Sequence, residues 1–232
     1  MKPATVGKFL WSIVGLILAL VWLFPVYWMA LSALTPNARL RQIPPNFLPT
    51  NVTWSNLRAV VSDPSFGSAL RMSLGITLLT VLLVLAFAFL AALAISRFRF
   101  RGRRSFILAV LLIQMLPAEG LFIAQYKMLS SMGAHVPAFG LNSLLGITLL
   151  YTAAVVPFTI WMLRGFVAGV PIELEEAAMV DGLSRTQAFL RITFPLLAPG
   201  LVASGVYAFL QAWNEFTIAL MVLPDSQSQT LP

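Results

Sequence analysis

The 232-residue sequence contains no cysteine and a single histidine, and only 10% of its residues are charged. The first absence excludes disulfides, thiolate metal sites and cysteine nucleophiles, and with one histidine we expect no histidine-based metal site. Soluble domains carry about 25% charged residues. The low charge density, together with 59% hydrophobic residues, therefore indicates an integral membrane protein.

Several catalytic and nucleotide-binding motifs are also absent. The sequence has no G-x-x-x-x-G-K-[ST] loop and no G-x-S-x-G or H-E-x-x-H pattern. Without a loop that cradles phosphates, the chain is not expected to hydrolyse ATP or to be an enzyme. The net charge of +7 does not predict a nucleic-acid partner, because the basic residues gather in short segments between apolar runs.

Five long apolar runs are present, and about 20 residues suffice for a helix to span a bilayer. They predict spanning helices near 9–34, 69–96, 105–128, 141–164 and 196–223. The first run is longer than the ~7–15 apolar residues of a secretory signal, so we interpret it as an uncleaved span. The predicted fold is all-α, a polytopic transmembrane helical bundle that forms a single domain over 1–232.

The basic residues between the runs are distributed asymmetrically. The segment 97–104, RFRFRGRR, holds five arginines. On the same predicted side of the membrane lie Lys2, Lys8, Arg164, Arg185 and Arg191. The opposite side receives Arg39, Arg41, Arg58, Arg71 and Lys127. The positive-inside rule places the first side, and with it the N-terminus, in the cytoplasm. We interpret the arginines of 97–104 as an orientation signal that contacts lipid headgroups.

An acidic segment, 171–195, separates the last two apolar runs. Three glutamates between 173 and 176 suit the positive end of a helix dipole. Gly182 predicts a left-handed helix end, and Ser184 with Gln187 predicts a capping box for a second helix. We therefore expect two short helices hinged at Gly182. Anionic cytoplasmic lipids would repel the first of them, which favours docking to another protein over lying on the bilayer.

The spacing within this segment is specific. Glu176-Ala177-Ala178 is followed by three residues, Gly182, nine residues, Ile192, one residue and Phe194-Pro195. This pattern resembles the EAA loop of bacterial ABC-importer permeases, which ends in Leu-Pro. Further similar stretches are Ala91 to Gly102, Met115 to Pro117, Leu163 to Phe166, and Ala212 to Phe216. Together they resemble the second membrane subunit of carbohydrate-type ABC importers, the maltose-permease kind.

The resemblance implies a permease subunit with the type I ABC-importer fold in the bacterial cytoplasmic (inner) membrane, forming half of the pathway for a sugar or oligosaccharide. It implies a heterodimer with a second permease subunit, two ATP-binding subunits that hold ATP and Mg, an extracytoplasmic substrate-binding protein, and no cofactor in this chain. Permeases of this family continue into a sixth helix, so we expect a sixth span to be missing at the C-terminus. The implied ATPase-coupling residues are Glu176, Ala177, Ala178, Asp181 and Gly182.

Polar residues inside apolar runs are costly and are candidates for function. Trp213, Asn214 and Glu215 combine a ring that stacks on a pyranose with groups that hydrogen-bond hydroxyls, so we expect them to line the pathway. Glu119 follows a proline and is a further pathway candidate on a kinked helix. The alternatives are that Glu215 is hydrated near the outer interface and that Glu119 forms an internal pair.

Two other functions remain open from the sequence. In the first, a permease of the same architecture imports a polyol, glycerol phosphate, an amino acid or a peptide. The second, more remote, is an ion-coupled secondary transporter or a channel. The spans contain only two plausible intramembrane acids and no paired cation in the same spans, which disfavours ion coupling.

Overall fold

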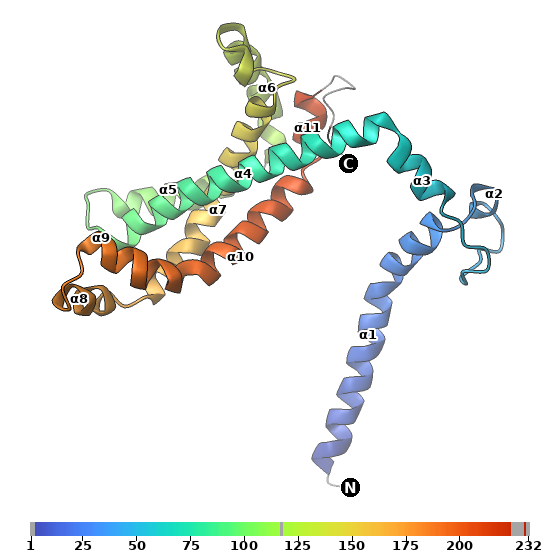
Figure 1. The fold of residues 1–232 in the computed structure, drawn as a ribbon, viewed down its shortest axis with the longest axis horizontal. Helices are drawn as coiled ribbons and strands as arrows, with labels where there is room; N and C mark the ends of the chain where they lie inside the picture. Colours follow the sequence, from blue (N-terminus) through green and yellow to red (C-terminus); the bar gives the residue numbers. More distant parts are fainter. Residues whose placement is uncertain (1–2, 117, 224–229, 231–232) are drawn as a thin grey trace. The chain divides into compact units, whose positions relative to one another are not determined.

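The computed structural model describes residues 3–116, 118–223 and 230. The chain folds as two compact units, Met1–Gly67 and Ser68–Pro232. Every regular element in the described ranges is a helix and none is a strand (Figure 1), so the all-α prediction is confirmed.

The first unit contains the long helix α1 (Pro3–Ala33) and two short helices, α2 (Asn37–Leu40) and α3 (Ser55–Ser62). Side-chain contacts hold α3, and the loop between α2 and α3, against the end of α1. The amide Nδ2 of Asn56 donates to the carbonyl oxygens of Ala33 at 3.2 Å and Thr35 at 2.8 Å. The ring of Trp28 lies 5.5 Å from that of Phe47, between centroids. The predicted loop between the first two spans is therefore ordered.

Asp63 joins α3 to the next long helix, α4 (Pro64–Arg97). Its carboxylate accepts the backbone N–H of Ser65 at 2.9 Å and the Ser65 hydroxyl at 2.7 Å. These two hydrogen bonds lower the pKa of the Asp63 carboxyl below its usual value. Proline in the first helical position costs no hydrogen bond, so this sequence favours a helix start at residue 64.

The second unit holds most of α4 and all later elements. In chain order these are α5 (Arg103–Gln114), η1 (Ala118–Leu121), α6 (Phe122–His135), η2 (Pro137–Phe139), α7 (Leu144–Gly169), α8 (Glu173–Val180), α9 (Arg185–Ala188), η3 (Phe189–Thr193), α10 (Phe194–Trp213) and α11 (Thr217–Val222). Figure 1 shows α8 and α9 at the same end of the unit as the end of α4 and the start of α5.

Four described helices are long and apolar enough to span a membrane: Gly7–Ala33, Pro64–Arg97, Leu144–Gly169 and Arg185–Trp213. The first three confirm the predicted spans 9–34, 69–96 and 141–164, with ends shifted by up to five residues. The fourth contains the first part of the predicted fifth span. The sixth span expected after residue 232 stays a prediction.

The predicted third span, 105–128, is wrong as a continuous helix. Helix α5 ends at Gln114, a short 3₁₀ turn follows at η1, and α6 begins at Phe122. The sequence has proline at position 117, which lacks a backbone N–H and disfavours helical backbone in the preceding residue. The proline therefore divides the apolar run into two helices instead of kinking one.

The predicted fifth span, 196–223, is also interrupted. Helix α10 ends at Trp213 and α11 begins at Thr217. At the break, the carbonyl oxygen of Leu210 accepts both the backbone N–H of Asn214 at 3.1 Å and its side-chain amide at 2.7 Å. The prediction failed because residues on both sides of the break are apolar, so hydropathy alone does not reveal it.

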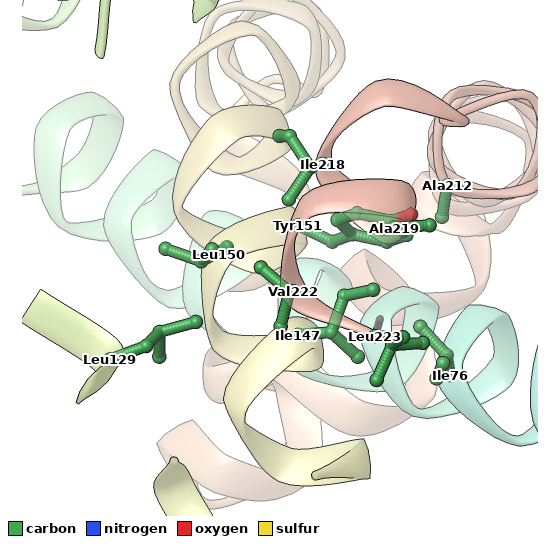
Figure 2. Packing of buried hydrophobic residues seen from close by; sticks show 10 residues of the cluster. All are labelled: Ile76, Leu129, Ile147, Leu150, Tyr151, Ala212, Ile218, Ala219, Val222 and Leu223. Atoms are coloured by element: carbon green, nitrogen blue, oxygen red, sulfur yellow. The ribbon is translucent and has the colours of Figure 1, made fainter. Parts of the chain in front are cut away.

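The core of the second unit runs along α4, α7 and α10. At one end, residues of five helices converge (Figure 2): Ile76 of α4, Leu129 of α6, Tyr151 of α7, Ala212 of α10 and Val222 of α11 are among them. Toward the other end, Ala88, Ala92 and Ile95 of α4 pack with Ile160, Leu163 and Val167 of α7 and with Leu197 of α10.

The buried face of α4 is lined mostly by small side chains. Six of its eight buried residues are smaller than isoleucine and recur every three or four positions: Ser73, Thr77, Thr80, Val84, Ala88 and Ala92. The other two are Ile76 and Ile95. Small residues let helix backbones approach closely, and in lipid such packing drives helix association because there is no hydrophobic gain between helices. The sequence of α4 therefore specifies a helix packed on others along one face.

Candidate functional site

The acidic segment folds as predicted around Gly182. Helix α8 ends at Val180, and Gly182 has a φ of +95°. The N–H of Leu183 donates to the Ala178 carbonyl oxygen, and the N–H of Gly182 to that of Met179, both at 3.1 Å. This pair of hydrogen bonds is the Schellman motif, which uses a left-handed residue to end a helix.

The predicted capping box is present at the start of α9. The Ser184 hydroxyl accepts the N–H of Gln187 at 3.3 Å, and the Gln187 side chain accepts the N–H of Ser184 at 2.9 Å. The prediction of a second, separate short helix is wrong. Helix α9 continues through the π-helical turn η3 into α10, so that Arg185–Trp213 forms one long helix. A movement of α9 is therefore carried directly into α10.

Most of the predicted contact residues lie on the surface of this segment. Glu176, Ala177, Asp181 and Gly182 are exposed. The fifth predicted contact residue, Ala178, is only 8% exposed. Adjacent residues on a helix point about 100° apart because a turn holds about 3.6 residues. Ala178 packs into its own chain and Ala177 faces outward.

A polar contact that the sequence did not predict braces α8 against the membrane helices. Arg97 at the end of α4 lies 3.4 Å from Glu175 of α8, measured from Nη2 to Oε1. The same oxygen of Glu175 accepts the hydroxyl of Thr193, in η3, at 2.6 Å. Arg97 also donates to the carbonyl oxygen of Val170, just after α7, at 3.2 Å. Arg97 thus contacts protein, whereas the sequence predicted contact with lipid headgroups.

No pattern in the sequence distinguishes the residues of this contact. Arg97 is one of five arginines in eight positions, and Glu175 is one of three glutamates in four. The contact does place the segments 97–104 and 171–195 at the same end of the helices, as the charge distribution predicted.

The second predicted group, Trp213, Asn214 and Glu215, lies at the break after α10. The carboxylate of Glu215 accepts the N–H of Ile218 at 3.0 Å, in the first turn of α11, and its backbone carbonyl accepts the hydroxyl of Tyr151 at 2.8 Å. The Trp213 ring stacks on Phe209, with centroids 5.6 Å apart. Glu215 therefore lies at a helix start, beyond the end of the long helix, and is half-buried.

A cavity of about 10 Å³ adjoins Glu215. Its lining residues are Ser73, Ile76, Thr77, Tyr151, Ala212, Trp213, Glu215 and Thr230. Ligand pockets typically measure about 300–1,000 Å³, so this cavity is too small for a sugar ring. The backbone of Glu119 lies in η1, and its side chain is outside the described part of the structure. Within the described ranges, no group of His, Cys, Asp and Glu side chains could hold a metal ion.

Comparison with known families gives a match over most of the second unit, beginning within α4. The family described as "Binding-protein-dependent transport system inner membrane component" matches residues 85–232. This range covers well over half of the chain and includes both groups of predicted functional residues.

Curated relatives match the whole length. The diacetylchitobiose uptake system permease protein of Streptomyces coelicolor is 40% identical over 100% of this chain and 82% of its own. The trehalose transport system permease protein of Mycobacterium tuberculosis is 31% identical over 96% of this chain and 78% of its own. The trehalose/maltose transport system permease protein of Thermococcus litoralis is 30% identical over 100% of this chain and 81% of its own.

A solved structure shares the fold. A chain in the crystal structure of a bacterial ABC transporter involved in the import of the acidic polysaccharide alginate superposes with a TM-score of 0.79. The match covers 98% of this chain and 78% of the other, at 22% sequence identity. The helical arrangement described above is therefore shared with a chain of that transporter structure.

Proposed function

Because the chain belongs to the family of binding-protein-dependent transport system inner membrane components, we propose that it is the permease subunit of an ATP-driven importer of a sugar or oligosaccharide. In this proposal the chain forms half of the translocation pathway and couples it to ATPase subunits through 171–195. The observation that carries the coupling is the exposed acidic helix α8, joined on both sides to long membrane helices.

The names of the relatives support the substrate class. Three of them are permeases for diacetylchitobiose, for trehalose, and for trehalose and maltose. All three substrates are short saccharides. We propose that this chain passes a compound of the same class, delivered by an extracytoplasmic binding protein.

The surface of α8 supports docking to an ATPase subunit. Glu176 and Asp181 are exposed and acidic, and exposed Ala177 leaves room for close approach of another backbone. Basic side chains on the partner would pair with these carboxylates. The two ATP-binding subunits would hold ATP and Mg, and this chain would contribute no catalytic group and no cofactor.

The remaining partners follow from the apolar surface. Helix α10 leaves Val202, Val206 and Leu210 exposed, four residues apart and so on one face. Lipid and a second permease subunit would cover such faces in a heterodimer. The proposed location is the bacterial cytoplasmic membrane with the N-terminus and α8 in the cytoplasm, because this puts the arginine-rich segment inside.

A reconstitution experiment tests the proposal. The chain is co-expressed with its neighbouring permease, ATPase and binding-protein genes, purified, and placed in liposomes. We expect the ATPase subunits to co-purify, and uptake of a labelled disaccharide to require internal ATP and the external binding protein. Uptake that does not require ATP and is driven by an imposed ion gradient would contradict the proposal. Uptake of labelled polyols, glycerol phosphate and amino acids in the same assay decides the substrate class.

We propose that Trp213, Asn214, Glu215 and Glu119 line the translocation pathway. Substitution of Glu215 tests this role for one of the four. Glu215→Gln keeps an oxygen that accepts the Ile218 N–H and removes the charge. A hydrogen bond to a charged group contributes about 1.5–3 kcal/mol. If the carboxylate binds a sugar hydroxyl, uptake at saturating binding protein falls about tenfold or more, which corresponds to about 1.4 kcal/mol or above. Unchanged uptake would show that the Glu215 carboxylate does not bind the sugar and serves only to accept the Ile218 N–H at the start of α11.

A further inference from the structure

Four separate elements meet at one polar contact. The guanidinium of Arg97 ends α4, the carbonyl oxygen of Val170 follows α7, the carboxylate of Glu175 belongs to α8, and the hydroxyl of Thr193 belongs to η3. Arg97 and Val170 are 73 positions apart in the sequence. Because α7 and α10 are joined to the acidic segment by the chain itself, α4 is the long helix that depends on side chains for this connection.

The contact is shielded from water but incompletely satisfied. The side chains of Arg97 and Glu175 are 17% and 12% exposed. The Nε of Arg97 is buried and has no hydrogen-bond partner within the described ranges. A hollow of about 370 Å³ lies beside the pair, lined by the two side chains and by Leu93, Phe98, Ile172 and Phe189 among others. The guanidinium thus has an unused donor and space into which it can shift.

The π-helical turn places Thr193 in this contact. The N–H of Phe194 donates to the carbonyl oxygen of Phe189, five residues earlier, which widens the helix at η3. Such single π turns occur mostly inside α-helices and frequently at functional sites. Thr193 is fully buried and its hydroxyl donates to the Glu175 carboxylate. A charge-assisted hydrogen bond of this kind is stronger than one between neutral groups.

We propose that Arg97, Glu175 and Thr193 form a clasp that transmits the movement of α8 to α4 and α10 during transport. They are positioning residues, since they contact neither the transported solute nor ATP. The inference rests on the proposed function, in which α8 is the element held by the ATPase subunit. It adds that α8 moves the pathway through α4 by a polar contact, not only through the chain connections to α7 and α10.

The test separates coupling from assembly in the complete reconstituted complex. Three variants weaken the clasp: Glu175→Gln and Arg97→Gln each remove one charge of the ion pair, and Thr193→Val removes the hydroxyl donor with little change of shape. For each, the co-purified ATPase subunits are quantified, and sugar uptake is divided by ATP hydrolysed. We expect normal subunit content and an uptake per ATP about tenfold lower for Glu175→Gln and Arg97→Gln. The double variant should lose less than the product of the two single losses, because Arg97 and Glu175 share one interaction.

Matched control variants remove one charge, as the clasp variants do, but at residues outside the clasp. Arg99→Gln lies just after α4 and Arg191→Gln in η3, and both side chains are exposed. Both should keep the wild-type uptake per ATP, and Arg97→Lys should retain more of it than Arg97→Gln. Wild-type uptake per ATP in both Glu175→Gln and Thr193→Val would overturn the clasp. Loss of assembly in those two variants with intact controls would also overturn it, in favour of a role in folding. Failure of the wild-type chain to retain ATPase subunits would instead contradict the proposed function.

Discussion

Replacing Gly182 by valine should reduce transport at least tenfold while leaving the chain inserted in the membrane. The φ of +95° at this position is a conformation that a β-branched residue adopts only under strain. Strain of this kind costs about 1–3 kcal/mol. A Cβ at Gly182 would meet no atom within 4 Å, so the cost arises from the backbone and not from a clash. A different turn conformation would relieve this strain, but it would change the direction of α8 and so displace the proposed docking surface.

Gly102 provides a matched control for this substitution. Its φ is +90°, and a Cβ there would also meet nothing within 4 Å. Gly102→Val should therefore cost similar backbone strain at the turn between α4 and α5 and yet retain most of the transport. Gly182→Asn should be milder than Gly182→Val, since asparagine tolerates the left-handed region. Uptake and retained ATPase subunits are measured for all three. Equal losses in the two valine variants would show a general folding effect and contradict the specific role of Gly182.

The turn at Gly182 was predictable because its chemistry is local. A left-handed glycine and a serine–glutamine capping box act over a few residues, and neither depends on what packs against them. The same is true of the long apolar runs that became α1, α4 and α7, because the bilayer thickness sets their length. These features could be predicted without knowledge of the tertiary structure.

The two interrupted spans show the limit of hydropathy. A window average over 105–128 or 196–223 remains apolar, whereas the backbone responds to single residues. A proline at position 117 separates α5 from α6, and Asn214 caps the end of α10. The π-helical turn at η3 had the opposite effect, because it let α9 continue into α10 where the sequence predicted a separate helix.

The contact of Glu175 with Arg97 and Thr193 could not be predicted from spacing. Its members come from the end of α4, the first turn of α8 and η3, and they meet only when the small-residue face of α4 packs on α7 and α10. Charge counting treated Arg97 as one basic residue among five. Its contacts with Glu175 and Val170, which depend on the tertiary structure, distinguish it from the exposed Arg99, Arg101 and Arg104 of the same segment.

Replacing Gly200 by leucine should destabilise the packing of α10 on α7 and lower the amount of folded protein. A Cβ at Gly200 would lie 2.5 Å from Cγ and 2.8 Å from Cβ of Phe166. These atoms belong to the root of the side chain, which cannot swing aside as a flexible end does. Overpacking typically costs about 1–3 kcal/mol. Gly200→Ala places the same Cβ against Phe166 but should destabilise the protein less than Gly200→Leu. Part of its cost is offset because alanine is favoured over glycine in a helix by about 1 kcal/mol.

Two further variants show whether the loss comes from this contact. Gly165→Leu adds the same bulk to α7 where a Cβ would meet nothing within 4 Å, and it should leave the thermal midpoint of the detergent-solubilised protein close to wild type. Phe166→Ala combined with Gly200→Leu removes the colliding ring and should recover part of the lost stability. A Gly200→Leu variant as stable as Gly165→Leu would contradict the close packing of α7 and α10. Because α10 continues from α9, that result would also weaken the route by which α8 is proposed to move the pathway.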